Sequence, residues 1–176
     1  NGPRQVVVSG VAAAIEQIVA RLEREGIAAT RLRVSHAFHS PLMNPMLEDF
    51  RNVAATVAFA RPRIKLISNL TGGLVDEAIA RPEYWVEHVR RTVRFSDGVA
   101  ALGREGINVA LEIGPQATLL GLARACWPTG SDQTSPRWLA SLRRGKPDWQ
   151  SVLDTLAELY VAGQSVDWAA LARGFR

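Results

Sequence analysis

Short apolar runs suited to strands alternate with longer stretches of helical periodicity through most of this chain. Residues 5–9 read QVVVS, residues 11–25 carry apolar side chains at helical spacing, and residues 31–34 alternate polar and apolar. This order predicts one β-α-β unit over residues 5–34. The same alternation recurs over residues 64–127. The pattern therefore predicts an α/β fold with strands and helices in layers.

The remaining elements follow from local periodicity and from glycine and proline. They are helices over 45–58, 95–105, 118–126 and 149–161, strands over 64–68, 108–112 and 138–142, a turn over 69–73, a helix opened by Pro82, and a last short helix capped by Asp167. The segment 128–136, PTGSDQTSP, has no periodicity and predicts a boundary or surface loop.

Composition excludes several classes of protein. The single cysteine, Cys126, allows no internal disulfide and no cysteine-based metal site, which fits a cytoplasmic protein. No apolar run approaches the roughly 20 residues of a membrane helix. The net charge is +4, but no nucleic-acid-binding motif accompanies it. Because the chain starts at Asn1 and not at a methionine, we expect a piece of a longer polypeptide.

Two of the three histidines lie close together in residues 35–41, SHAFHSP, which follow an expected strand. A loop on a rigid scaffold is a common place for catalytic groups, and a histidine there could act as a general base. A metal site would need further ligands, and His88 is the only other imidazole. From the residues alone, a base, a metal site and histidines without chemistry all remain open.

A histidine base also needs a nucleophile, commonly a serine in a Gly-X-Ser-X-Gly elbow between a strand and a helix. The nearest match, residues 163–167, reads GQSVD. It follows a helix and ends in aspartate, so we reject it as an elbow. If His39 is a base, its serine lies outside this sequence.

Seven short motifs, in order, carry a resemblance to a known family. They are NGPRQVVVSG at 1–10, HAFHSP at 36–41, ISNLTG at 67–72, PEYW at 82–85, VRF at 93–95, EIGP at 112–115, and the tail from RWLASLRR at 137 through VDW at 166–168. Together they resemble polyketide-synthase acyltransferases, the malonyl-CoA:acyl carrier protein transacylase family, from the middle of the domain onward.

The resemblance implies an α/β-hydrolase-like core with a ferredoxin-like small subdomain. Residues 1–35 would be the second half of that subdomain, residues 36–127 the C-terminal part of the large subdomain, and residues 128–176 the linker that follows the acyltransferase. The serine elbow of the family would precede Asn1. The chain alone is therefore expected to be inactive.

The resemblance also implies a role for each residue of the histidine motif. His39 would be the catalytic base, oriented by a main-chain carbonyl expected within residues 77–81. Phe38 would select malonyl-CoA, because its ring fills the space that an α-methyl group needs, whereas His36 and Ala37 would shape the same surface. Asn69 could lie near the cleft or could only form the turn.

Arg90, Arg91 and Arg94 form a basic cluster at helical spacing. They could contact the phosphates of CoA or an acidic carrier protein, or they could form a solvated helix face. The resemblance implies no metal and no bound cofactor, with malonyl-CoA as the substrate.

The expected function is transfer of a malonyl unit from CoA to the phosphopantetheine thiol of an acyl carrier protein in a modular polyketide synthase. The expected partners are the N-terminal half of the domain, the carrier protein and, through the linker, the adjacent ketosynthase, with no nucleic acid or membrane. Two alternatives stay open: selection of methylmalonyl or a starter acyl group, and a non-catalytic interdomain module.

Overall fold

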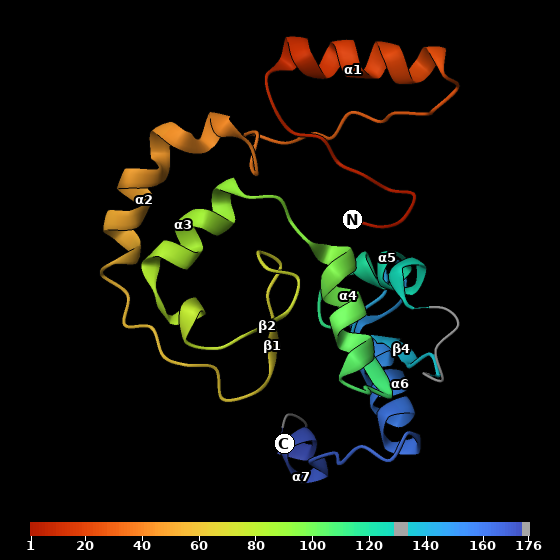
Figure 1. The fold of residues 1–176 in the computed structure, drawn as a ribbon. Helices are drawn as coiled ribbons and strands as arrows, with labels where there is room; N and C mark the ends of the chain where they lie inside the picture. Colours follow the sequence, from red (N-terminus) through yellow and green to blue (C-terminus); the bar gives the residue numbers. More distant parts are fainter. Residues whose placement is uncertain (129–133, 174–176) are drawn as a thin grey trace. The chain divides into compact units, whose positions relative to one another are not determined.

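The fold is given by a computed structural model that describes residues 1–128 and 134–173 (Figure 1). The chain divides into two compact units, Asn1–Ala101 and Leu102–Arg176, and each is described by itself. Each unit combines helices with a two-stranded sheet. This mixture agrees with the α/β fold expected from the sequence.

The first unit opens with α1 (Ala12–Arg24), a helix that the periodicity predicted. The strands predicted on either side of it, over 5–9 and 31–34, are wrong. The structure has only an isolated bridge between Gly2 and Gln5 in this region. A strand exists through its pairing with another strand, and Val6 and Val34 stay 80% and 69% exposed. The ferredoxin-like assignment of residues 1–35 stays a prediction.

The segment after the histidine loop forms a 3-10 helix, η1 (Pro41–Met46), that continues into α2 (Leu47–Ala54). The helix predicted over 45–58 is thus present but begins as a tighter 3-10 turn and ends earlier. α2 packs against α3 (Pro82–Arg90), which begins at Pro82 as predicted. Ala54 of α2 is buried, whereas Val53 and Val57 are exposed.

A hairpin and two more helices complete the first unit. β1 (Leu66–Ile67) pairs antiparallel with β2 (Leu74–Val75), so the predicted turn over 69–73 is confirmed. η2 (Glu77–Ala80) leads into α3, and α4 (Phe95–Arg104) follows it. Gly72 has a left-handed φ of 73°, and a Cβ at this residue would lie 2.5 Å from Asp97 Cβ. The turn therefore packs directly on the first turn of α4.

The second unit contains a parallel β-α-β arrangement. β3 (Val109–Glu112) pairs with β4 (Arg137–Ala140) in the register Val109↔Arg137 to Glu112↔Ala140, and α5 (Leu119–Cys126) lies in the connection. α5 and α6 (Asp148–Val161) pack on β4, and α7 (Trp168–Arg173) follows. Leu139 and Ala140 of β4 are buried.

The second unit contains residues on both sides of the boundary that the sequence predicted at residues 128–136. β4 lies beyond residue 128 and pairs with β3 before it. Most of the predicted boundary loop, residues 129–133, falls outside the described residues, so the linker assignment for 128–176 stays a prediction. Asp167 caps α7, as expected, because its Oδ1 accepts from Ala170 N at 2.8 Å. No helix in the described part of the chain is long and apolar enough to span a membrane.

Candidate active site

His39 adopts a backbone conformation that few residues adopt. Its φ is 62°, and it is the one described residue other than glycine with a positive φ. Such a conformation costs about 1 kcal/mol or more for a residue with a Cβ and persists only where surrounding contacts hold it. One such contact is the backbone N–H of His39, which donates to the carbonyl of Val89 at 2.9 Å.

The His39 side chain is held by the same helix end. Nδ1 lies 2.8 Å from the carbonyl oxygen of Arg91, the C-cap residue of α3. A carbonyl oxygen can only accept, so Nδ1 carries the proton in this bond. In the neutral ring the lone pair is then on Nε2. The carbonyl end of a helix also favours a positive charge, which suits the imidazolium that forms when Nε2 takes up a proton.

The position of this orienting carbonyl corrects the sequence-based expectation, which placed it within residues 77–81. Carbonyls in that segment have other partners: Ile79 accepts from Trp85 Nε1 at 3.0 Å, and Arg81 accepts from Tyr84 N at 3.2 Å. Arg91 escaped prediction because its main chain, and not its side chain, makes the contact.

The histidine motif forms one compact loop around Ser40. Ser40 is 1% exposed, and its hydroxyl donates to the carbonyl of Ala37 at 2.7 Å and accepts from Leu42 N at 3.2 Å. His36 and Phe38 are perpendicular with ring centroids 6.3 Å apart, and the rings of Phe38 and His39 are 6.4 Å apart. The structure therefore brings the motif residues together. Their roles stay predictions.

Three aromatic rings surround His88, which the sequence offered only as a spare imidazole. Its ring is perpendicular to that of His39 at 6.0 Å, parallel to that of Tyr84 at 6.1 Å, and 6.4 Å from that of Trp85. Burial lowers the pKa of His88, and the positive charge that His39 carries when protonated lowers it further. The i, i+4 spacing of Tyr84 and His88 on α3 was the signal for this contact.

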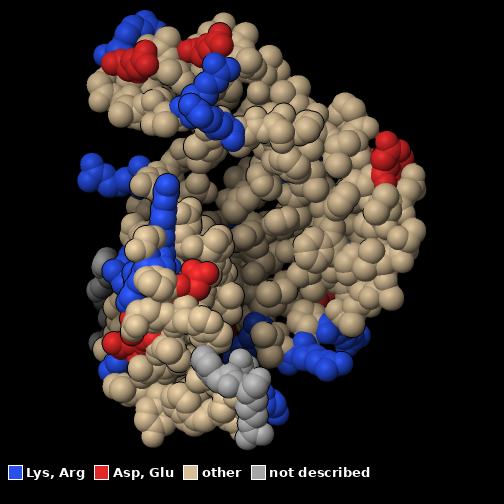
Figure 2. Space-filling model, turned by 180° about the vertical axis from the view of Figure 1, so that it is seen from behind, with Lys and Arg blue, Asp and Glu red and all other residues tan. Residues whose placement is uncertain are grey.

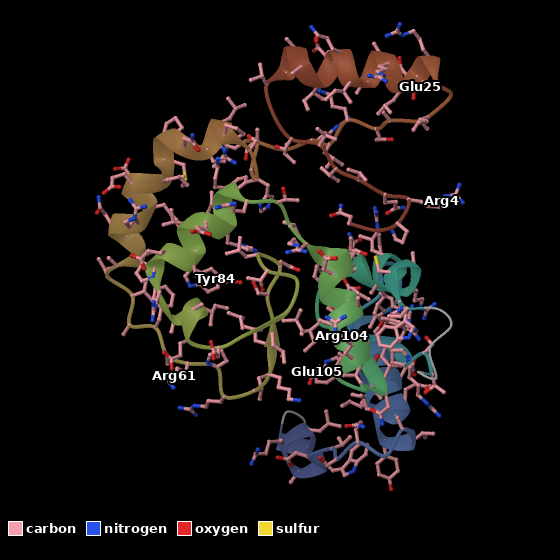
Figure 3. The ribbon with its side chains drawn as sticks, viewed as in Figure 1. Arg4, Glu25, Arg61, Tyr84, Arg104 and Glu105 are labelled. Carbon is pink, nitrogen blue, oxygen red and sulfur yellow. The ribbon has the colours of Figure 1, made fainter. Side chains whose placement is uncertain are left out.

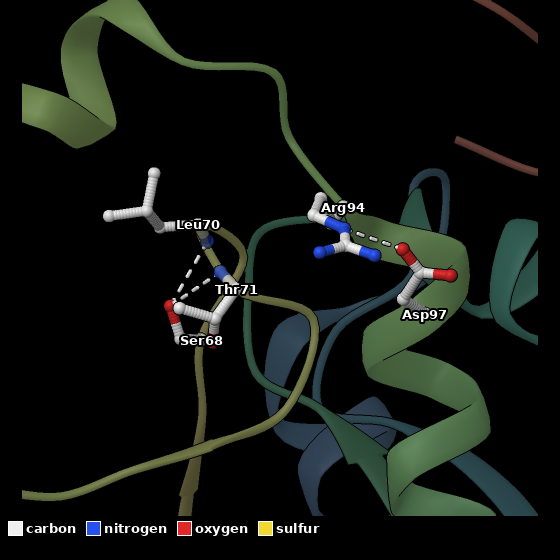
Figure 4. A network of polar contacts seen from close by, with 5 residues as sticks. All are labelled: Ser68, Leu70, Thr71, Arg94 and Asp97. Atoms are coloured by element: carbon white, nitrogen blue, oxygen red, sulfur yellow. Dashed lines mark hydrogen bonds and ion pairs between the residues drawn. The ribbon is translucent and has the colours of Figure 1, made fainter.

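The three arginines have different surroundings. Arg90 Nε donates to Asn44 Oδ1 at 2.8 Å and so ties α3 to η1. Arg94 Nε donates to Asp97 at 2.7 Å (Figure 4). The Arg91 side chain is exposed. On the face drawn in Figure 2, Lys and Arg occur in several groups, some of which have Asp or Glu beside them.

Asn69 contributes to the site region through its main chain. Its carbonyl accepts from Arg94 N at 2.7 Å, which fixes the chain three residues after the carbonyl that holds His39. Asn69 is exposed, and both roles that the sequence left open for it, near the cleft or only in the turn, stay predictions. The same turn is closed by Ser68 Oγ, which accepts from Leu70 N and Thr71 N (Figure 4).

A histidine that acts as a base is commonly oriented by a third group, as the Arg91 carbonyl orients His39 here. Residues 1–166 match the family described as the acyl transferase domain, and the chain belongs to this family. It is 42% identical to polyketide synthase GfsA of Streptomyces halstedii over 99% of its own length. It is 41% identical to phenolphthiocerol synthesis polyketide synthase type I Pks15/1 of Mycobacterium marinum, again over 99%.

Solved structures show the same likeness. The acyltransferase domain from the second module of the salinomycin polyketide synthase matches with a TM-score of 0.82 and 43% identity over 93% of this chain. The acyl transferase domain of SpnD in complex with 2-(pent-4-yn-1-yl)malonyl matches with a TM-score of 0.79 and 36% identity over 88%. These likenesses confirm the α/β fold and the polyketide synthase acyltransferase family.

The chain is short beside these relatives. It spans 2% and 8% of the two synthases and 37% and 38% of the two solved domains.

Proposed function

We propose that this chain is the C-terminal part of an acyltransferase domain that moves a malonyl unit from CoA to the phosphopantetheine thiol of an acyl carrier protein. The observation that carries the proposal is the hydrogen bond from His39 Nδ1 to the Arg91 carbonyl. With the proton on Nδ1 in this bond, Nε2 is the ring nitrogen available to act as the base. A histidine without chemistry would not need a left-handed backbone held by two carbonyls of one helix end.

The proposed reaction has two symmetrical halves. His39 Nε2 takes the proton of a serine hydroxyl in the part of the domain that precedes this sequence, and the serine oxygen attacks the malonyl thioester. The C–S bond breaks, and the departing CoA sulfur receives the proton from His39. In the second half, the carrier-protein thiol gives its proton to His39 and its sulfur attacks the carbonyl of the acyl-serine. The ester C–O bond breaks, and the serine oxygen receives the proton from His39. Without that serine, the chain alone is expected to transfer no acyl group.

Phe38 is the residue that we propose discriminates against an α-methyl group. Its ring lies beside that of His39 and is 45% exposed, so it is available to meet a bound acyl group. One methyl group changes binding in an apolar site by about 1–3 kcal/mol, so the preference for malonyl should be incomplete. His36 and Ala37 would shape the same surface, because Phe38 contacts the His36 ring.

A second candidate is selection of a substituted malonyl unit. The SpnD acyl transferase domain, 36% identical to this chain, was solved in complex with a malonyl group that carries a pentynyl substituent. A related pocket can therefore hold a group larger than malonyl, and Phe38 is the residue whose replacement would separate the two candidates.

The test is intact mass spectrometry of the complete acyltransferase domain that contains this chain. It is exposed briefly to malonyl-CoA or methylmalonyl-CoA, as wild type, His39→Ala and Phe38→Ser. We expect a malonyl adduct that dominates in wild type, is largely lost in His39→Ala, and gives way to more methylmalonyl adduct in Phe38→Ser. Equal labelling of wild type by both substrates would refute the selectivity. An absence of any adduct would favour a non-catalytic interdomain module.

The partners proposed with this function are the preceding half of the domain, the acyl carrier protein and the adjacent ketosynthase, all within a cytoplasmic multienzyme. Arg91 is the arginine of the basic cluster best suited to meet CoA phosphate or an acidic carrier protein, because Arg90 and Arg94 already bond to neighbouring side chains. No metal or dissociable cofactor takes part in this reaction.

A further inference from the structure

We propose that His88 is a positioning residue for His39, and that its ring, backed by Tyr84, keeps the His39 imidazole in the orientation that leaves Nε2 ready to exchange protons. The inference rests on the proposed function, because it concerns the same histidine, but it assigns a role to a residue outside the motif.

The first step is that one hydrogen bond does not fix a ring. The bond from Nδ1 to Arg91 holds one atom of the imidazole, and rotation about the Cβ–Cγ bond would exchange that bond for another orientation. A second contact is needed to keep a single orientation. The ring of His88 supplies one, because it lies perpendicular to the His39 ring at a centroid distance of 6.0 Å.

The second step is that His88 is itself held. Tyr84, one helical turn earlier on α3, stacks parallel to it with an interplanar angle of 8° (Tyr84 is labelled in Figure 3). Tyr84 is buried, and its hydroxyl shares a hydrogen bond of 2.6 Å with Ser68 Oγ. Ser68 is fixed in turn by the N–H groups of Leu70 and Thr71. A chain of contacts therefore runs from the hairpin turn to the catalytic histidine.

The third step concerns charge. A positive His88 would repel the imidazolium that forms on His39 during transfer. Burial and the His39 charge both lower the pKa of His88, so its neutral form is favoured. A neutral aromatic ring in this perpendicular contact would not repel that imidazolium. An aromatic residue at position 88 should therefore preserve the orientation of His39, whereas an aliphatic residue should not.

The experiment uses the complete acyltransferase domain and measures the single-turnover rate of acyl-enzyme formation with malonyl-CoA. The variants are His88→Ala, His88→Phe and His88→Gln, with Glu87→Ala as the matched control from an exposed position on α3. The imidazole ¹⁵N spectrum of His39 gives a second readout, because it reports which ring nitrogen carries the proton. A merely structural role for His88 would not change that tautomer.

We expect His88→Ala and His88→Gln to slow acylation by about 10- to 100-fold and to leave His39 as a mixture of tautomers. His88→Phe should stay within about 3-fold of wild type with one tautomer, and Glu87→Ala should match wild type. Wild-type rates in both ring-less variants, or an unchanged tautomer in them, would overturn the inference. If His88→Ala does not fold, His88→Gln decides. Acylation that persists in His39→Ala would instead overturn the proposed function itself.

Discussion

Two helix ends of opposite polarity, one in each unit, are each met by an ionisable side chain from another segment. The carbonyl end of α3 receives His39, and the N–H end of α5 receives Glu112. Both pairings follow the helix dipole, which favours positive charge at the C-terminus and negative charge at the N-terminus. The two residues nevertheless differ in how much of their bonding capacity the helix takes up.

Glu112 is fully engaged. One carboxylate oxygen accepts from Thr118 N and Leu119 N at 2.9 and 3.0 Å, and the other from Leu119 N and Leu120 N at 3.0 and 2.9 Å. Burial raises the pKa of Glu112, but the N–H groups of Leu119, Thr118 and Leu120 outweigh it and lower the pKa below the ordinary value of 4.5. His39 gives the helix one ring nitrogen and keeps the other. The full bonding of its carboxylate indicates a structural role for Glu112, whereas Nε2 is the atom through which we propose that His39 acts.

His39→Asn tests the chemical side of this comparison and should have the largest effect. The asparagine amide nitrogen takes the place of Nδ1 and can still donate to the Arg91 carbonyl, so the loop should stay in place, but the proposed base is gone. We expect acyl-enzyme formation to fall by about 10²- to 10⁴-fold with little change in melting temperature. Acylation rates and melting curves of the complete domain measure both. A large loss of stability with little loss of acylation rate would show that His39 has a structural role and not the proposed chemical one.

Gly72→Ala tests how tightly the turn at residues 68–73 packs on α4, in the unit that also contains His39. The added Cβ would meet Asp97 Cβ at 2.5 Å and would sit at a positive φ. We expect a loss of about 2 kcal/mol in unfolding free energy. Gly73→Ala is the matched control, because nothing lies within 4 Å of its Cβ position. Equal denaturation midpoints for the two variants would contradict the tight packing described here.

Glu112→Gln tests the structural side. One carboxylate oxygen becomes an NH₂ group that cannot accept from the α5 N–H groups. We expect a loss of about 1–2 kcal/mol in unfolding free energy, with acylation kept within several-fold of wild type. Glu16→Gln, at an exposed position on α1, is the control and should change neither quantity. A loss of acylation rate without a loss of stability would instead give Glu112 a role in the reaction, like the one proposed for His39.

The smallest expected effect is the pH dependence of the difference in stability between wild type and Glu112→Gln. Because the folded-state pKa of Glu112 is lowered, its stabilisation is present above the ordinary value of 4.5 and is lost as pH falls through the folded-state pKa. The gap in melting temperature between wild type and Glu112→Gln should therefore be full at pH 7 and narrow below pH 4.5. A gap that stays constant over this range would show that the carboxylate charge contributes nothing.

Local signals in the sequence predicted much of this molecule. Pro82 set the start of α3, and the turn at Gly72 and Gly73 was found from glycine alone. Motif resemblance pointed to His39. What failed depends on partners far away in the chain. The strands expected over 5–9 and 31–34 have no partner among the described residues, and periodicity cannot report pairing.

The geometry of the site was less accessible than its residues. The contact of His39 with Arg91 spans 52 positions and uses a carbonyl that every residue type carries. No side-chain pattern encodes it. Glu112 was likewise part of a recognised motif, but its carboxylate is explained only by the three N–H groups at the start of α5.

The left-handed backbone at His39 has a consequence for how this position responds to mutation. Glycine and asparagine adopt that conformation readily, whereas valine and isoleucine do not. A library of all residues at this position, sorted only for soluble yield, should enrich glycine and asparagine. The same library sorted for product should enrich histidine alone. The difference between the enrichment for soluble yield and the enrichment for product measures how strongly activity selects histidine at this position, where folding alone would favour other residues.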